Sequence, residues 1–353
     1  MSSRHSHRIA FVACNKRADL YRSDPSFIYR CENLGLALSQ LDYTVSNHHM
    51  KTFRVMKRHD IVVFHRPKAS ARLWWLLRAL RRMGVTAIAD FDDLVFDKSY
   101  AAASPGVLNN LVSLSATKRL YQLHQLALSW FDAVTVSTEP LAEHVTRLHP
   151  HKKTQVIHNY THKSWQGDAQ RQGSHNQKKV ITYFPGTRSH DRDFALIVEP
   201  LTVFLMSHPE VELRITGKLA FKINASSGQI SQEEKVSFAD YKKRVQSGWV
   251  NLAPLEDTPF NQCKSALKII EAGFFGIPTI CSPNTDNQRF VGAGALVANT
   301  PETWLACLED MLDESKYQQA CEQSHENSIA IANIDTEAGV FIKFATRQRD
   351  NQA

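Results

Sequence analysis

The sequence predicts an α/β protein made of two successive, doubly wound halves. In the first half, apolar runs such as His7–Cys14 and Asp60–Pro67 alternate with segments of helical periodicity such as Phe27–Leu41. A second cycle of the same kind starts at Val180, after a polar stretch that has no periodicity. Strands that alternate with helices form parallel sheets with right-handed crossovers, so we expect two Rossmann-like domains.

The first half, residues 1–160, is expected to form one domain. Each of its strands is a short apolar run, and each of its helices has apolar residues at spacings of three and four. Pro67 stops the third strand, and Gly84 ends the helix that follows it. In order, we expect strands at 7–14, 43–46, 60–67, 85–90, 133–137 and 155–158, and helices at 27–41, 69–83, 114–131 and 140–148.

Residues 161–179 are rich in Gln, Gly, Ser and Lys, and they predict a linker between the halves. The second domain is expected over 180–335. It would include an irregular, partly helical insertion at 219–247, and the chain would end in helices within 301–349. Its other elements would be strands at 180–184, 211–216, 249–253 and 277–281, and helices at 191–207 and 258–276.

Composition restricts the class of protein. The 353 residues suit two domains, and 43% hydrophobic with 22% charged residues is ordinary for a soluble chain. No apolar run approaches the length that crosses a bilayer, and Met1–Arg8 is polar rather than signal-like. The six cysteines lack metal-site spacing and are expected to be reduced, so we expect a cytoplasmic protein.

The net charge narrows the choice of partner. A formal charge of +7 and a pI near 9.0 favour an anionic partner, such as a nucleotide, a phospholipid surface or nucleic acid. The basic residues are dispersed and no nucleic-acid-binding motif is present, so we expect no nucleic-acid partner. The absence of Gly-x-Gly-x-x-Gly after the first strand, and of Gly-x-Ser-x-Gly, argues against a dinucleotide dehydrogenase and a serine hydrolase.

The stretch 258–283 contains the strongest functional signal. Thr258 followed by Pro259 is a helix start, and the apolar residues after it form one helical stripe. Lys264, Lys268 and Glu271 form a second stripe beside the first. In a cleft, ammonium groups would bind phosphate and the carboxylate would bind paired sugar hydroxyls. The alternative is an amphipathic helix with solvated lysines and a Glu271–Lys268 pair.

A turn at the start of the second domain adds an anion site. Gly186-Thr187-Arg188 follows a strand and precedes a helix, so its backbone amides and the positive end of the helix would favour an anion. Arg188 can add a bidentate phosphate contact, and Arg192 is a weaker candidate. The alternative is a surface turn with a solvated arginine. Two basic sites at successive strand-to-helix edges favour the functional interpretation.

The stretch 258–283 resembles the C-terminal signature of retaining glycosyltransferases of family four, which have the GT-B fold. There, a helix with an acidic residue and a Gly-x-Pro strand entry hold the ribose and diphosphate of a nucleotide-sugar. Glu271-Ala272, Gly276 and Pro278 match this pattern. A second acidic residue usually precedes the first by eight positions, where this chain has Cys263. A branch of the family with a Cys-Lys-Ser-x-x-Lys-x-x-Glu run is closer.

The resemblance implies a fold, a reaction and a set of roles. Two domains would face a cleft, and a last helix at 336–353 would pack back on the acceptor-binding first domain. The enzyme would be a metal-independent hexosyltransferase without a cofactor, using a UDP- or GDP-linked donor. Arg188, Lys264 and Lys268 would neutralise the departing diphosphate, and Glu271 would hold the ribose. The acceptor would attack on the same face, helped by the leaving phosphate.

The same resemblance implies a biological setting. The acceptor would be a glycan or lipid-linked glycan in the synthesis of a bacterial surface polysaccharide (O-antigen, capsule or exopolysaccharide). Two alternatives remain open: a GT-B sugar-nucleotide epimerase, and a non-catalytic GT-B-like scaffold, to which Cys263 points.

The first domain has its own candidates. Asp92 and Asp93 lie in an acidic run that ends a strand, where they would bind or orient acceptor hydroxyls; helix capping and loop hydrogen bonds are the alternative. We expect no metal at these aspartates. Tyr29-Arg30 resembles a Tyr-Arg pair near the acceptor cleft of similar sequences. The alternative is that Arg30 lies on a solvated face of its helix. His158-Asn159 would reach the donor or act as a hinge.

The helix at 69–83 has two interpretations. Its run Arg72–Met83 combines four arginines with Trp74 and Trp75. Such a helix can lie on an anionic membrane, where each basic residue contributes on the order of 1 kcal/mol. That placement would suit an enzyme at the inner face of the plasma membrane that takes lipid-linked acceptors. The alternative is a sheet-covering helix with an arginine-rich outer face.

Overall fold

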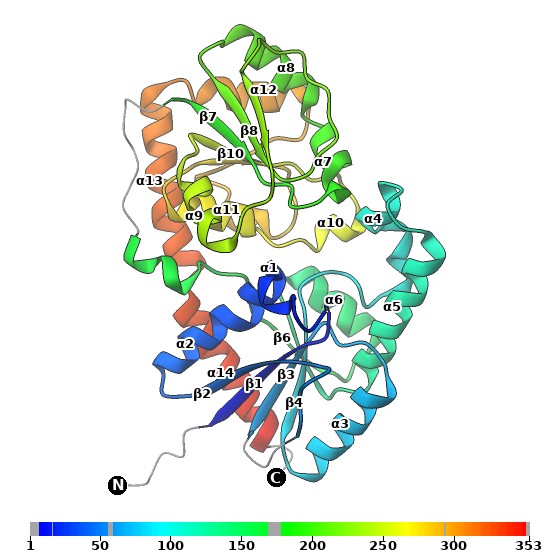
Figure 1. Cartoon of the computed structure of the whole chain (residues 1–353). Coiled ribbons are helices and arrows are strands. Elements are labelled where there is room, and N and C mark those ends of the chain that lie inside the picture. Colours follow the sequence, from blue (N-terminus) through cyan, green and yellow to red (C-terminus); the bar gives the residue numbers. More distant parts are fainter. Residues whose placement is uncertain (1–6, 16, 56–58, 169–177, 293, 351–353) are drawn as a thin grey trace. The chain divides into compact units, whose positions relative to one another are not determined.

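The computed structural model describes residues 7–15, 17–55, 59–168, 178–292 and 294–350, and the chain divides into two compact units (Figure 1). The first unit contains the chain up to Ala102, Leu114–Ser164, and the chain from Ile334 onward. The second unit contains Ala103–Ser113 and Trp165–Asn333. Each unit is an α/β domain with a parallel six-stranded sheet, so the predicted fold class of two doubly wound domains is confirmed.

The sheet of the first unit has the strand order β2-β1-β3-β4-β5-β6. All of its neighbouring strands are parallel. The strands are β1 (Arg8–Ala13), β2 (Thr44–His49), β3 (Ile61–His65), β4 (Thr86–Phe91), β5 (Ala133–Val136) and β6 (Lys153–Val156). The helices are α1 (Pro25–Phe27), α2 (Leu34–Gln40), α3 (Ala71–Arg82), α5 (Leu114–Ser129), α6 (Glu139–Leu148) and α14 (Ile334–Asp350).

The burial of these strands explains why they read as continuous apolar runs. Every residue of β3 is buried, as expected for an inner strand of a parallel sheet that is covered on both faces. The last helix, α14, belongs to this unit: its Phe341 lies near Phe11, with the ring centroids 6.2 Å apart and the rings tilted by 34°. Phe341 and Ala345 share a core with Leu38 of α2. The C-terminal segment therefore completes the core of the first unit.

The helix expected over 27–41 is divided. Between α1 and α2, residues Ile28–Asn33 form a π-helical turn. The side chains of Arg30 and Asn33 are buried there; the Asn33 amide donates to the carbonyl of Thr161 and accepts from the N–H of Lys163. Inward polar side chains that bond to other segments account for the wider turn, and such π-turns are frequent at functional sites.

The sheet of the second unit has the order β12-β11-β10-β7-β8-β9, and its strands are also parallel. The strands are β7 (Val180–Tyr183), β8 (Glu212–Thr216), β9 (Ile230–Glu233), β10 (Val250–Ala253), β11 (Thr279–Cys281) and β12 (Ala295–Val297). The helices are α4 (Pro105–Leu108), α7 (Asp191–Ala195), α8 (Val198–Ser207), α9 (Phe238–Gln246), α10 (Pro259–Gln262), α11 (Leu267–Phe274), α12 (Pro301–Asp310) and α13 (Glu314–Ile331).

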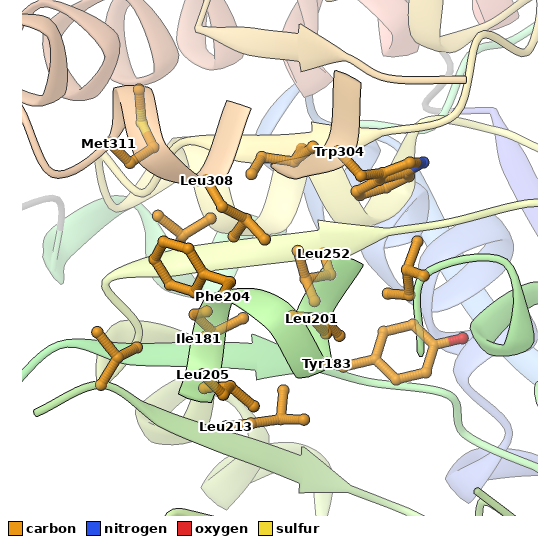
Figure 2. Close-up of a cluster of buried hydrophobic side chains, with 14 of the residues drawn as sticks. Ile181, Tyr183, Leu201, Phe204, Leu205, Leu213, Leu252, Trp304, Leu308 and Met311 are labelled. Carbon is orange, nitrogen blue, oxygen red and sulfur yellow. The ribbon is translucent and has the colours of Figure 1, made fainter. Parts of the chain in front are cut away.

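One apolar core of this unit lies between the sheet and the helices α8 and α12 (Figure 2). The strands contribute Ile181, Leu213 and Leu252, and α12 contributes Trp304 and Leu308. The insertion expected at 219–247 contains one strand that was not predicted, β9, and one helix, α9. This core holds the loops at the strand ends in place.

Two segments differ from the domain plan that the sequence suggested. Ala103–Ser113, expected in the first domain, belongs to the second unit, and its α4 contacts the turn Arg188–His190. Of the expected linker 161–179, residues 161–168 pack into the units: Trp165 is 2% exposed and lies against Phe275. Residues 169–177 of that linker lie outside the described residues, and Lys178 forms an ion pair with Glu212 of β8 at 2.5 Å.

Candidate functional site

The topology of the second unit locates one candidate site. Strands β7 and β10 are neighbours, and the chain proceeds from them toward opposite edges of the sheet. In open α/β sheets, ligands bind at this switch point, beyond the carboxyl ends of the two strands. The turn with Gly186 follows β7, and the segment with Lys264 follows β10. The two basic segments predicted from the sequence therefore come from the two strands that flank the switch point.

The turn after β7 has the conformation that an anion site needs. Gly186 has φ of +72°, in the left-handed region that favours glycine. Thr187 follows in an extended conformation and precedes the helical turn Arg188–His190. The Arg188 guanidinium is 55% exposed and forms an ion pair with Asp191 at 3.1 Å. Arg188 is thus accessible, and Asp191 orients it.

The helix predicted over 258–276 is divided into α10 and α11, so the single-helix prediction is wrong. Its start is as expected: Pro259 is the first residue, and the Thr258 hydroxyl accepts from the N–H of Asn261 at 3.1 Å. The chain then leaves the helical path at Cys263, and the second piece begins at Leu267. Cys263 itself is 1% exposed.

Side chains from the loop after β11 account for this break. The Asn284 amide donates to the carbonyls of Asn261 and Lys264, at 3.3 and 3.0 Å. The Asp286 carboxylate accepts from the N–H of Ala266 at 2.7 Å, at the start of α11. These groups replace hydrogen bonds that a continuous helix would make along its own axis. Lys264 therefore lies in a turn, and Lys268 lies in the first turn of α11.

Lys268 and Glu271 extend from α11 toward neighbouring polar groups. Glu271 is 5% exposed and accepts from the Tyr241 hydroxyl of α9 at 2.7 Å. Lys268 lies over the Tyr183 ring, with 5.7 Å between its ammonium nitrogen and the ring centroid. Burial lowers the pKa of Lys268 to about 8, and repulsion from Lys264 adds to this, although Asp193 and Glu271 oppose it. The nearby carboxylates therefore do not fully compensate the positive charge of the Lys268 ammonium.

Asp193 of α7 joins the two basic segments. One carboxylate oxygen accepts from His190 Nδ1 at 2.7 Å, and the other accepts from the N–H of Glu256 and from the Asn261 amide. Burial lowers the pKa of His190 to about 4, and the charges of Lys268 and Lys264 contribute in the same direction. These interactions place the turn after β7 close to both lysines.

Asn109, from the segment Ala103–Ser113, holds the same turn from another side. Its amide nitrogen donates to the carbonyl of Ser189 at 2.8 Å, and its amide oxygen accepts from the N–H of Arg192 at 3.2 Å. The Arg192 side chain itself forms a bidentate ion pair with Glu256. That pair makes Arg192 less available to a ligand than Arg188.

The first unit has a second polar cluster at its own switch point, beyond the carboxyl ends of β1 and β3. His65 ends β3, is fully buried, and has its Nδ1 2.9 Å from the carboxylate of Asp90. Because a carboxylate only accepts, the Nδ1 atom carries the proton. Arg30 forms a buried ion pair with Asp90 at 2.6 Å and donates to the carbonyl of Ile157 at 2.5 Å.

Asp92 and Asp93 face Arg66 in this cluster. The Arg66 guanidinium bonds to both carboxylates at 2.5 Å, and the Ser26 hydroxyl donates to Asp92. Burial opposes the charge on Asp92, but Arg66 outweighs this and holds the pKa of Asp92 well below its usual range. Arg66 has φ of +50°, a strained value for a residue other than glycine, of the kind found at functional sites.

Two further predictions concern the first unit. Arg30 is 3% exposed, so the interpretation as a solvated helix face is wrong for it. Asn159 is buried and accepts from Arg30, and the N–H of His158 donates to Glu337 of α14. These contacts place both residues within the first unit.

Several site residues were not predicted: Asp193, His190, Asn109, Tyr241 and Arg66. Asp193 had a usable signal, since it lies seven residues after Gly186, in the helix that follows the predicted turn. His190 also lies at this turn, two residues after Arg188, whereas Asn109, Tyr241 and Arg66 come from segments that are distant in sequence.

Two features are absent from the described residues. Among them, no helix is both long and apolar enough to cross a membrane. Within the same residues, no three His, Cys, Asp or Glu side chains are grouped as metal ligands would be.

Comparison with known proteins shows the fold. No protein-family model and no curated protein matches the sequence. Among solved structures, sucrose-phosphate synthase from Thermosynechococcus elongatus is similar with a TM-score of 0.64 and 13% identity, over 97% of this chain and 98% of that one. A glycosyltransferase from Rickettsia africae ESF-5 has a TM-score of 0.64 and 10% identity, over 98% and 99%.

HepE from Anabaena, solved with UDP-glucose, has a TM-score of 0.61 and 10% identity, over 96% of this chain and 99% of that chain. A putative UDP-N-acetylglucosamine 2-epimerase from Listeria monocytogenes is less similar, with a TM-score of 0.51 and 11% identity, over 92% of this chain and 95% of that chain. At these identities the likeness shows the two-domain GT-B type of fold.

Proposed function

We propose that this chain is a retaining glycosyltransferase that binds a UDP- or GDP-linked sugar at the switch point of the second unit. The observation that carries the proposal is the convergence there of two basic segments. Asp193 binds both of them, and the charges of Lys264 and Lys268 act on His190 of the turn after β7. Solved structures of the same fold include a glycosyltransferase and a protein in complex with UDP-glucose.

Each residue at this edge has a role in the proposal. Arg188, Lys264 and Lys268 neutralise the diphosphate as it leaves with the negative charge of the broken bond. The backbone of Gly186 and Thr187 lies against the phosphates. Glu271 accepts from the ribose hydroxyls, in a position fixed by the Tyr241 hydroxyl. The reaction needs no resident cofactor and no metal, because side-chain cations supply the positive charge.

The first unit binds the acceptor in this proposal. Asp92 and Asp93 accept hydrogen bonds from acceptor hydroxyls, while Arg66 fixes their orientation. The attacking hydroxyl approaches the face from which the diphosphate departs, and the leaving phosphate accepts its proton. The acceptor is a glycan or lipid-linked glycan of a bacterial surface polysaccharide, and the enzyme works in the cytoplasm at the inner face of the plasma membrane.

Titration calorimetry with UDP and GDP tests donor binding first. We expect one nucleotide to bind, and Arg188→Ala to weaken binding by about tenfold to a hundredfold through loss of a charge-assisted contact. The control is Arg192→Ala, which removes a neighbouring arginine already paired with Glu256 and should change affinity little. Absence of binding for every nucleotide tested would contradict the proposal.

Turnover separates the proposal from its alternatives. A transferase consumes the sugar nucleotide only with an acceptor, and NMR of the product should show the anomeric configuration of the donor. An epimerase, which the Listeria structure keeps open, would convert the free nucleotide-sugar without an acceptor. A scaffold would bind nucleotide without turnover. Glu271→Gln should abolish transfer and leave the protein folded.

A further inference from the structure

We infer that helices α3 and α5 of the first unit form a docking surface for an anionic lipid bilayer. This inference goes beyond the proposed transfer reaction and does not depend on it. The sequence drew attention to the segment 69–83 alone, whereas the structure adds a second helix.

The two helices cover the same face of the sheet. Strands β3, β4 and β5 are consecutive neighbours, and right-handed crossovers between them place α3 and α5 on one side (Figure 1). Hydrogen bonds confirm that they are adjacent. The N–H of Ala69, just before α3, donates to the carbonyl of Leu123 on α5, and the Arg81 guanidinium donates to the carbonyl of Trp130 after α5.

The outer surface of both helices exposes large apolar side chains. On α3, Leu73, Leu77 and Leu80 face the sheet, while Trp74 and Trp75 are 42% and 61% exposed. The two indole rings are 4.9 Å apart in an edge-to-face arrangement. On α5, the exposed apolar residues lie at intervals of three: Leu120, Leu123 and Leu126. Single exposed apolar residues are common, but a group on adjacent helices indicates an interaction site.

The charge of this surface has one sign. The two helices contain six basic residues and no Asp or Glu. The basic residues are Arg72, Arg78, Arg81, Arg82, Lys118 and Arg119. Arg81 has an acidic neighbour, Asp132, at 3.3 Å, whereas Arg78 lies 5.6 Å from the centre of the Trp74 ring. Tryptophan and leucine on a basic surface match an interface between lipid headgroups and acyl chains.

Other occupants fit the surface less well. A second copy of the chain related by a two-fold axis would set the surface against itself and bring like charges together. Nucleic acid would satisfy the arginines and stack on the tryptophans, but it would leave the three leucines of α5 without an apolar partner.

Vesicle flotation with the full-length protein tests the inference without any nucleotide or sugar. We expect binding to vesicles that contain phosphatidylglycerol, little binding to phosphatidylcholine alone, and a decrease with added salt. Arg78→Glu with Arg82→Glu should lower partitioning by more than about tenfold. The matched control is Lys343→Glu with Arg347→Glu, an exposed basic pair at the same spacing on α14 of the same unit, which should bind as the wild type does.

A second pair of changes tests insertion. Trp74→Ser with Trp75→Ser should reduce partitioning and abolish most of the quenching of tryptophan fluorescence by brominated lipid. Thermal melts of every variant establish that it is folded. Equal flotation of the Arg78/Arg82 variant and the Lys343/Arg347 variant would overturn the inference. It would also be overturned by a dimer in ultracentrifugation that the tryptophan changes dissociate, or by single-stranded RNA that binds more tightly than vesicles.

Discussion

Charged side chains gather beyond the carboxyl ends of the strands in both sheets. The charges there are paired in the first unit, whereas a lysine is incompletely compensated in the second. At the first edge, the buried Arg30 pairs with Asp90, and the partly buried Arg66 pairs with Asp92 and Asp93. Burial opposes the charge of Arg30, yet Asp90 outweighs it and raises the pKa of Arg30. The arginine charges of that cluster are therefore already paired with carboxylates of the same unit.

At the second edge, the cation is destabilised. The pKa of Lys268 falls to about 8 because burial and Lys264 outweigh Asp193 and Glu271. A bound diphosphate would supply the missing negative charge. The direction of a pKa shift on a buried cation thus distinguishes a structural ion pair from a site that favours an anionic ligand. The first edge can instead offer hydrogen bonds to neutral hydroxyls, since its charges are already paired.

The largest expected effect comes from breaking the buried ion pair between Arg30 and Asp90. Arg30→Met leaves the Asp90 carboxylate buried without its guanidinium, and should cost about 3–5 kcal/mol in the free energy of unfolding. Urea denaturation measures this. Arg17→Met removes an exposed arginine that is 2.6 Å from Asp19, the same separation as in the buried pair, and should have no measurable effect. Equal effects would show that burial does not distinguish the two pairs.

The next largest effect is expected at Asp193, which connects the two basic segments of the second unit. Asp193→Ala removes the acceptor for His190, Asn261 and the N–H of Glu256, and leaves buried donors without partners. We expect a loss of about 3 kcal/mol of stability and weaker UDP binding. Asp257→Ala, at an exposed carboxylate that accepts from Gln262, is the control and should be close to wild type. Unchanged UDP affinity in Asp193→Ala would show that this connection is not needed for the site.

Lys268→Met separates stability from binding. Because the ammonium is already destabilised, its removal should change the free energy of unfolding by less than about 1 kcal/mol. UDP affinity should fall by about tenfold to a hundredfold, since a charge-assisted hydrogen bond is lost. Calorimetry and urea denaturation on the same sample give both quantities. A large loss of stability with unchanged UDP affinity would show that Lys268 serves the fold rather than the binding of an anionic ligand.

The smallest effect is a dependence on pH. Lys268 has a pKa of about 8 in the free protein, and a bound diphosphate raises it, so binding takes up a proton above pH 8. UDP affinity should therefore be highest below pH 8, and should fall by at most about tenfold per pH unit above it. Lys268→Arg, which stays charged, should remove this decrease. A decrease that persists in Lys268→Arg would assign it to another group.

The sequence by itself determined the two α/β domains and the basic segments of the second one. Strand and helix periodicity, Thr258 as a cap, and Gly186 at a turn are local properties, and parallel topology then places strand ends at one edge. Tertiary structure decided the rest. Asn284 and Asp286 divide the helix at Cys263, and Asn109 reaches the turn after β7 from a segment expected in the other domain. Such contacts join residues far apart in the chain, and no local pattern encodes them, because their energy depends on burial and partner geometry rather than on sequence spacing.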